Sequence, residues 1–313
     1  MEEELFSSGR NIPHIDPTLE VWHWPISIYL FLGGLAAGLL FFAGAVTILD
    51  KEKEYPTAVK YASIISPVAL SLGLLALVYD LTHPLYTWQL YTTIRLESPM
   101  SWGAWVLLIV TPLSFLWVIS YFSEIFPKWK LRLGILKKLE SFTKKNRKKM
   151  AYALIPLSII LGVYTGILLS AFNARPLWNN AILGPLFLTS GLSTGAATIL
   201  LLAKTHKEKN LFSRIDLVLI VIELGLIVHM LMGMYAGSEV QLEAMQLLVG
   251  GEFTLMFFGF VIILGLLVPA ILELTEILGY KVPVSIPAIL ILIGGLVLRF
   301  VMVEAGQITR YLY

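Results

Sequence analysis

Long runs of apolar residues, separated by short polar stretches, dominate the chain. An α-helix crosses a hydrocarbon layer ~30 Å thick with roughly 20 apolar residues. Eight segments meet this requirement, so the pattern predicts eight transmembrane helices. The predicted spans are Pro25–Leu49, Lys60–Leu81, Ser101–Ile125, Ala151–Phe172, Asn180–Ala203, Ile215–Tyr235, Phe253–Leu278 and Pro283–Ala305.

Composition supports the membrane assignment. Hydrophobic residues make up 57% of the 313 positions and charged residues 14%, with a mean hydropathy of +0.80. Soluble domains carry about 25% charged residues, because a protein core cannot absorb so much apolar side chain. The net charge of +2 gives no argument for a nucleic-acid partner. We therefore expect an all-α integral membrane protein in contact with lipid.

The distribution of basic residues predicts the orientation. The connections after the first, third, fifth and seventh spans hold 18 lysines and arginines, whereas the termini and the other connections hold 4. Basic residues are retained on the cytoplasmic side of a membrane. Both termini are therefore expected outside, in a multi-pass protein of the cytoplasmic (inner) membrane.

The connection after the third span is long and basic. Its apolar residues Leu131, Ile135, Leu139 and Phe142 recur at helical spacing. Such a segment either lies as a helix along the inner membrane surface or is a basic loop that only fixes the topology.

A weak internal repeat relates the first and fifth spans. Both contain Leu-Phe-Leu, at 30–32 and 186–188, followed by Gly-Leu and a second glycine four residues after the first. We expect one polytopic domain over residues 1–313, built as two four-helix bundles at about 25–172 and 180–305. Small residues four apart let transmembrane helices approach closely. The pairs of this kind are Gly34/Gly38, Gly162/Gly166, Gly191/Gly195 and Gly233/Gly237.

Several polar residues of the first four spans fall toward the outer side. They are His23, Asp80, Tyr164, Asn173 and Arg175. Polar groups within a membrane are costly and usually functional. A quinone ring accepts hydrogen bonds at its two oxygens and exchanges two protons when its redox state changes. Imidazole, carboxylate and phenol groups suit that task, so this set predicts a quinone site.

A simpler interpretation exists for some neighbouring groups. Trp22, Trp24 and Trp178 have the composition of an aromatic belt at the membrane surface, where a histidine is often only interfacial. Glu273 and Glu276, close to the inner end of the seventh span, are likewise expected at the interface.

The second half carries its own ionisable groups, which are Glu223, His229, Arg299 and Glu304. They are candidates for a proton path. A structural ion pair of Arg299 with Glu223 or Glu304 explains the same residues equally well.

The sequence also indicates which electron carriers to expect. It contains no cysteine, which leaves no thiolate for an iron–sulfur cluster. Of the five histidines only His229 lies clearly within a span, so paired haem ligands are not expected either. No metal site is predicted. A protein of this kind that handles a quinone needs a partner to carry the electrons.

Several stretches of the sequence together carry a family resemblance. They are Tyr164-Thr165-Gly166-Ile167-Leu168-Leu169-Ser170, Arg175-Pro176-Leu177-Trp178, Pro185-Leu186-Phe187-Leu188 with Ser190-Gly191, Asp80-Leu81, and the stretch from Arg299 to Gly306-Gln307. In this order, over essentially the whole chain, they resemble the NrfD/PsrC family. Its members are membrane subunits of polysulfide reductase-like molybdoenzyme complexes and of related nitrite reductase systems.

The resemblance implies a haem-free subunit that binds a quinol, of the menaquinone type. Electrons would pass to a ferredoxin-like iron–sulfur subunit on the outer face, which feeds a molybdopterin catalytic subunit. The family's quinone site maps onto His23, Asp80 and Tyr164, with aspartate where the polysulfide reductase member has glutamate. The long basic connection after the third span departs from the compact members and leaves the terminal substrate open.

Two other classes of function remain. The second-half carboxylates could form the path of a transporter or channel without redox chemistry, or the protein could be a passive anchor. In no case does it contain a complete active site for a terminal substrate.

Overall fold

The computed structural model describes residues 22–128, 134–280 and 282–309. Within these residues eight helices are long and apolar enough to cross a membrane, one for each predicted span, and no strand occurs. The spans are α1 (Trp24–Ile48), η2 (Thr57–Tyr61) continued by η3 (Ala62–Ile64) and α2 (Ile65–Asp80), α4 (Pro99–Ser120), α7 (Arg147–Ser170), α8 (Leu183–Leu202), α9 (His206–Tyr235), η5 (Leu255–Leu267) continued by α11 (Val268–Ile277), and α12 (Ser285–Ile308). The shorter helices are η4 (Pro84–Tyr86), α3 (Gln89–Thr92), α5 (Phe122–Ile125), α6 (Gly134–Lys145) and α10 (Glu239–Leu248).

Local chemistry sets the ends of these helices. Proline stands in the first turn of α1 and α4, where the missing N–H would have had no helical partner. Helix α9 begins at His206, well before the predicted Ile215. The reason is the cap formed by Thr205, whose hydroxyl accepts a hydrogen bond from the Glu208 N–H at 3.2 Å.

Glu208 also joins the two halves of the chain. Its buried carboxylate accepts hydrogen bonds from the Thr57 N–H at 2.6 Å and from the Thr57 hydroxyl at 2.8 Å. An anion is favoured at a helix N-terminus, where backbone N–H groups lack partners. The first turn of α9 therefore caps the start of the second span.

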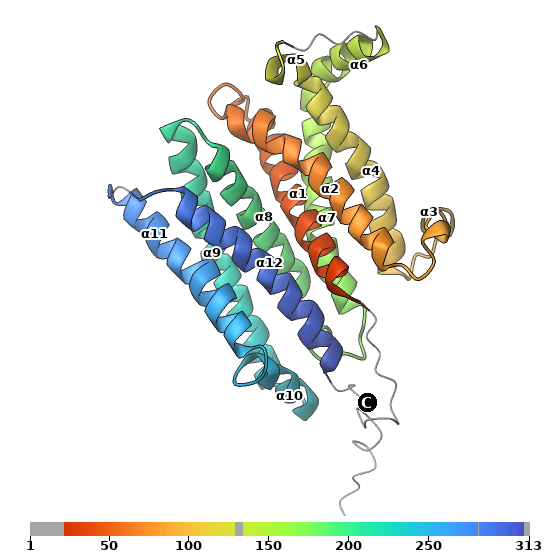
Figure 1. The fold of residues 1–313 in the computed structure, drawn as a ribbon, viewed down its shortest axis with the longest axis vertical. Coiled ribbons are helices and arrows are strands. Elements are labelled where there is room, and N and C mark those ends of the chain that lie inside the picture. Colours follow the sequence, from red (N-terminus) through yellow and green to blue (C-terminus); the bar gives the residue numbers. More distant parts are fainter. Residues whose placement is uncertain (1–21, 129–133, 281, 310–313) are drawn as a thin grey trace, which may run out of the picture.

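Helices α1 and α8 lie side by side in the middle of the molecule. In Figure 1 the first four spans group on one side and the last four on the other, with α1 and α8 between them. Their backbones meet where Gly34 and Gly38 face Gly191 and Gly195. We call these four residues the glycine crossing. It explains the two glycine pairs in physical terms, because larger residues would hold the two backbones apart.

The other glycine pairs differ in role. A Cβ on Gly166 would collide with the backbone of Leu183, so this glycine lets α7 approach α8. Gly233, in contrast, has no neighbouring atom within 4 Å of a built Cβ, and Gly237 faces only Gln241 and its own helix. The expectation of a helix contact at Gly233 and Gly237 is therefore wrong.

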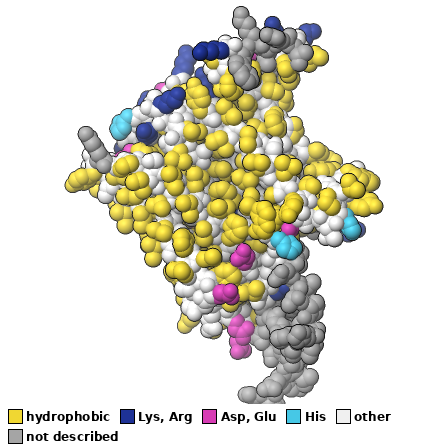
Figure 2. All heavy atoms as spheres, viewed as in Figure 1, with side chains coloured by type: hydrophobic (Ala, Val, Ile, Leu, Met, Phe, Trp, Pro, Cys, Tyr) yellow, Lys and Arg dark blue, Asp and Glu magenta, His cyan; other side chains and the backbone are white. Residues whose placement is uncertain are grey.

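The two ends of the helical array differ in charge. Figure 2 shows lysine and arginine side chains gathered at the end that carries α5 and α6, and acidic ones toward the opposite end. We call the first the basic end. The other is the His23 end, where the Trp22 N–H donates to the Gln307 side chain at 2.7 Å and so brings the start of α1 and the finish of α12 together. The prediction that the basic end faces the cytoplasm rests on the positive-inside rule.

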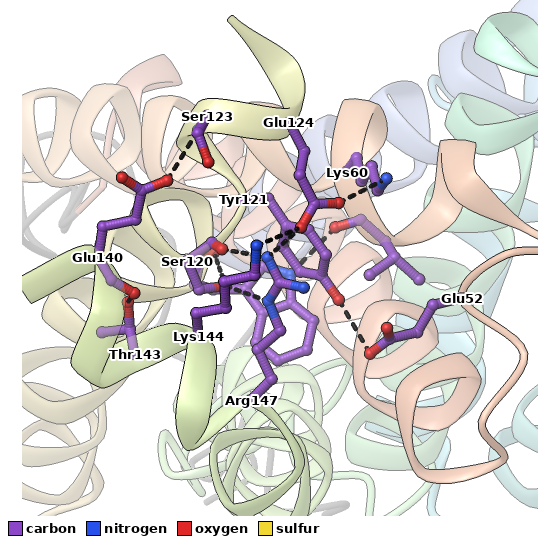
Figure 3. Close-up of polar contacts among 12 residues, drawn as sticks. Glu52, Lys60, Ser120, Tyr121, Ser123, Glu124, Glu140, Thr143, Lys144 and Arg147 are labelled. Atoms are coloured by element: carbon purple, nitrogen blue, oxygen red, sulfur yellow. Dashed lines mark hydrogen bonds and ion pairs between the residues drawn. The ribbon is translucent and has the colours of Figure 1, made fainter. Parts of the chain in front are cut away.

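A polar network fastens the basic end of α4 to α7 (Figure 3). The Glu124 carboxylate forms ion pairs with the Lys60 ammonium at 2.7 Å and with the Arg147 guanidinium at 2.7 Å. The Arg147 guanidinium also lies over the Tyr121 ring, 3.5 Å from its centroid, and the Tyr121 hydroxyl donates to Glu52 at 3.0 Å. These contacts hold α5 against the start of α7.

Helix α6 lies in the long basic connection. It exposes the apolar side chains of Ile135 and Phe142 on its free face, as a helix in contact with lipid would. Leu131, the first residue of the predicted apolar face, lies outside the described residues.

We expect Glu124→Gln to make the thermal stability less dependent on pH. Partial burial raises the pKa of Glu124, but the hydrogen bonds and charges of Lys60 and Arg147 outweigh it and lower the pKa from 4.5 to about 2. A carboxylate with a lowered pKa stabilises the fold fully above its unfolded pKa, and this contribution is lost as the pH falls through the folded pKa. The melting temperature of the variant in detergent should lie below that of the parent at pH 7, and the gap should close between pH 4.5 and 2.

The matched control is Glu54→Gln. Glu54 pairs with Lys207 at 2.7 Å, but both side chains are well exposed, and exposed pairs contribute ~0–1 kcal/mol. A gap between parent and Glu124→Gln that stays constant over the acid range would contradict the assigned role of this carboxylate.

Candidate quinone site at the His23 end

The first two spans bring His23 and Asp80 together. His23 immediately precedes α1 and Asp80 is the last residue of α2, so neighbouring antiparallel helices place both at one end. The His23 Nδ1 lies 3.0 Å from the Asp80 Oδ1. The carboxylate side chain is 7% exposed and the imidazole 62%. A buried acid thus holds a histidine that remains open to another molecule.

This contact sets what each histidine nitrogen does. An ionised carboxylate only accepts hydrogen bonds, so the contact places a proton on Nδ1. The Nε2 atom of His23 is then left to accept a proton or a hydrogen bond from a molecule at the membrane surface.

Tyr164 lies deeper, within the first four spans. Its ring is buried against α4 at Gly103, where any Cβ would overlap the phenol. The phenol also interacts with the phenol of Tyr29 on α1. Tyr29 in turn interacts electrostatically with Tyr91 of α3. Tyr29 is six residues after His23, roughly 9 Å along the helix axis. Two buried phenols therefore lie below the His23–Asp80 contact.

Sequence reasoning missed Tyr29. It appears as one aromatic residue in an apolar helix, and hydropathy gives no reason to separate it from the packing residues around it. The signal was its position: it lies on the same span as His23, less than two turns deeper. Only the packing of α1 against α7 shows that it meets Tyr164.

A cavity of 470 Å³ opens beside this site, between the end of α2 and the start of α4. His83, Gln89 and Arg95 are among the polar residues that line it, together with several threonines and serines, and Leu81, next to Asp80, forms part of its wall. A second pocket of 270 Å³, lined by Trp102 and other residues, shares Arg95 with it. Neither pocket is lined by His23, Asp80 or Tyr164.

The two other residues predicted for this site differ in environment. Asn173 lies in the loop after α7 and is exposed. Arg175 is buried, and its guanidinium donates to the Thr309 carbonyl oxygen at 2.5 Å. This contact ties the loop after α7 to the end of α12.

The aromatic-belt interpretation is wrong for Trp178. This side chain is 1% exposed and donates from Nε1 to the Met302 carbonyl oxygen at 2.7 Å. Its ring packs on Trp22, with 5.2 Å between the centroids, so it supports the residue next to His23. Trp24, at 56% exposure, does have the position that a belt residue needs.

The second half brings Arg299 and Glu223 together but not the other predicted members of a proton path. Arg299 is fully buried and donates to the Ser190 hydroxyl at 2.5 Å, and it interacts electrostatically with Glu223. His229 and Glu304 are exposed on the outside of their helices. Of the two acids considered for Arg299, Glu223 is the one that interacts with it electrostatically, but neither lies within ion-pair distance of its guanidinium. The assignment of these groups to a proton path stays a prediction.

Two further buried acids were not foreseen as members of a site. Asp216 and Glu273 are each 0% exposed and interact with one another between α9 and α11. The expected interfacial position of Glu273 is therefore wrong, whereas Glu276 is partly exposed. The signal in the sequence was the spacing of Asp216 and Glu223. Residues seven apart lie on one face of a helix, and here that face is the buried one.

Comparisons with known proteins match nearly the whole chain. A family model described as "Polysulphide reductase, NrfD" matches residues 12–310. The protein NrfD of Escherichia coli strain K12 is 33% identical over 92% of this chain and 96% of its own length. The C chain of polysulfide reductase from Wolinella succinogenes is 32% identical over 92% of this chain and 94% of its own. The C subunit of the selenate reductase from Mesobacillus selenatarsenatis is 25% identical over 93% and 75%.

Proposed function

The chain belongs to the polysulphide reductase NrfD family, and on that premise we propose that it is the quinol-oxidising (or quinone-reducing) membrane subunit of a respiratory reductase complex. Relatives are named as chains of polysulfide and selenate reductases, which supports a membrane subunit that works beside other chains. The observation that carries the proposal is the contact of His23 with Asp80 at the mouth of the first four spans.

In this proposal, residues at different depths of the site have different roles. Oxidation of a hydroquinone releases two protons and two electrons. The Nε2 atom of His23 accepts a proton from the ring hydroxyl, and Asp80 stabilises the resulting imidazolium. Tyr164 and Tyr29, buried below, bind a ring oxygen that reaches further into the bundle. Asn173 and Arg175 shape the loop at the entrance.

The electrons leave to a partner on the same side. The sequence has no cysteine for a cluster of its own, so a ferredoxin-like iron–sulfur subunit at the His23 end is the acceptor that we propose. That subunit would feed a molybdopterin catalytic subunit. The segments 82–100, with α3, and 237–252, with α10, both lie at the His23 end and offer it a docking surface (Figure 1).

We expect Asp80→Asn to lower quinol-dependent turnover of the purified complex about 10²-fold, since general acid–base groups contribute roughly 10²–10⁴-fold. The amide keeps the size of the side chain but no longer stabilises an imidazolium. Tyr164→Phe should lower turnover by a smaller factor, about tenfold, because it removes only one hydrogen bond to the ring. Turnover is measured by following quinol oxidation with the natural partner subunits present.

Matched controls separate the site from its surroundings. Glu54→Gln changes an exposed acid at the basic end, outside the proposed docking segments, and Tyr152→Phe changes a phenol on α7 that is 58% exposed. Both should leave turnover unchanged. Parental turnover and parental inhibitor sensitivity in Asp80→Asn would refute a direct role for the His23–Asp80 contact.

A transporter remains the second candidate, favoured by the buried acids of the last four spans. Proteoliposomes with this protein alone discriminate between the two. Solute or ion flux without any redox partner supports transport, whereas bound quinone together with inhibitor-sensitive electron transfer supports the redox subunit. A passive anchor predicts neither result.

A further inference from the structure

The carboxyl groups of Asp216 and Glu273 face each other in the interior of the last four spans. Both side chains are 0% exposed. Asp216 Oδ1 accepts a hydrogen bond from the Ser193 hydroxyl at 2.6 Å. The other oxygen of Asp216 and both oxygens of Glu273 have no hydrogen-bond partner among the described residues. The quinone site at the other end of the molecule uses neither group.

The charged groups around the pair do not neutralise it. From α9, Asp216 faces Glu223, and from α11, Glu273 faces Glu276, so both neighbours are acidic. Helix α8 contributes the Ser193 hydroxyl. No lysine, arginine or histidine among the described residues lies within ion-pair distance of either carboxyl.

The nearest cations belong to other carboxyls. Arg299 of α12 interacts with Glu223, and His206 and Lys209, at the start of α9, interact with Glu276. Two carboxylates that are desolvated side by side repel one another, and each also loses the hydration that an ion needs. A shared proton, carried by one carboxyl and accepted by the other, removes this repulsion and gives the facing oxygens a hydrogen bond.

The pair lies on a line of polar groups that starts at the basic end. Glu276 is one turn from Glu273 and partly exposed, so it connects the pair to the aqueous surface. In the other direction Asp216 and Glu223 share the buried face of α9, roughly 10 Å apart along the axis. Glu223 then meets Arg299 near the glycine crossing, because the Arg299 guanidinium lies against Gly34.

We propose that Asp216 and Glu273 form a proton-binding carboxyl pair that exchanges its proton with the basic end of the molecule through Glu276. Glu273 holds the proton and Asp216 accepts the hydrogen bond. Loss of the proton leaves two facing carboxylates, and uptake restores the neutral–charged pair. This site goes beyond the proposed quinone chemistry and does not depend on it. A bound metal ion is a poorer fit, since the described residues offer no group of three side chains suited to hold one.

A hydrophobic carbodiimide tests the proposal, since such reagents modify protonated carboxyls in apolar surroundings. We expect dicyclohexylcarbodiimide to label Glu273 in the membrane-embedded protein, as read by peptide mass spectrometry. Labelling should fall as the pH rises and the shared proton is lost. The exposed Glu239 of α10 is the internal control, and an ionised carboxylate there should stay unlabelled.

Two variants test whether the carboxyls act as a pair. In Asp216→Asn the neighbouring negative charge is gone, so the pH at which Glu273 labelling is half lost should move down by about one unit or more. In Glu273→Gln, labelling at position 273 disappears and Asp216 is left as a single carboxylate. A third variant, Glu276→Gln, also removes an acidic neighbour of Glu273, so the midpoint should move in the same direction but by less than in Asp216→Asn.

The outcomes separate this proposal from the quinone site. Absence of label on Glu273 at every pH, or a midpoint that Asp216→Asn leaves unmoved, would overturn the pair. Quinol oxidation measured on the same variants is expected to persist, so failure of labelling and failure of quinol chemistry are read independently.

Discussion

Gly38→Ala is expected to prevent α1 and α8 from packing as they do in the native protein. A Cβ at this position would lie 3.0 Å from the Gly191 carbonyl carbon and 3.1 Å from the Leu192 Cα, both of them backbone atoms. Neither atom can move by a change of rotamer, so the two helices must separate along the whole crossing. Overpacking a rigid core typically costs about 1–3 kcal/mol and sometimes more, and we expect the upper end here.

The measurement is the yield of monodisperse protein and its melting temperature after extraction in a mild detergent. Gly225→Ala serves as the control, because a Cβ built on this α9 glycine has no neighbour within 4 Å. It should behave as the parent or slightly better, since alanine favours a helix. A Gly38→Ala protein with the parental melting temperature would show that the crossing is not a tight contact.

Arg299→Met should be the most destabilising change in the last four spans, at about 3–5 kcal/mol. The guanidinium is fully buried and donates to Ser190, to the Gly295 carbonyl at 3.0 Å and to the Phe187 carbonyl at 3.1 Å. Methionine keeps much of the volume but leaves Glu223 buried without its cation. The loss is measured as a shift in the unfolding midpoint in mixed micelles.

A second substitution assigns the cause of that loss. Adding Glu223→Gln to Arg299→Met removes the charge left without a partner, so the double variant should regain part of the stability. Because the two groups share one network, their effects should not add. Equal stability of Arg299→Met and the double variant would place the whole loss in the hydrogen bonds to α8 instead.

Hydropathy was sufficient to predict all eight spans, because the ability to cross a membrane depends on the length and composition of a segment alone. It could not predict their ends. Helix α9 extends back to His206 because of a cap at Thr205, and α4 stops at Ser120, short of the predicted Ile125. Such ends depend on single hydrogen bonds.

For the candidate site, too, the sequence predicts the end of the molecule at which a residue lies but not the direction in which its side chain points. That His23 and Asp80 lie at one end follows from the topology, which the order of the spans determines. Which face of a helix a residue occupies is set by packing, and the estimate of depth along the helix says nothing about it. His229 and Glu304 therefore appeared equivalent to Glu223 in the sequence, although of these three only Glu223 points inward.

The glycine crossing has a consequence for the origin of the protein. Helices α1 and α8 run in the same direction, occupy corresponding places in the two halves, and meet through corresponding glycines. This is the geometry of an isologous contact, in which one surface pairs with a copy of itself about a two-fold axis. A single four-helix unit bearing such a helix could dimerise through it before the two copies were fused. Under such an origin the two halves have since come to differ in their polar groups, because the histidine–aspartate contact lies in the first and the buried acids lie in the second.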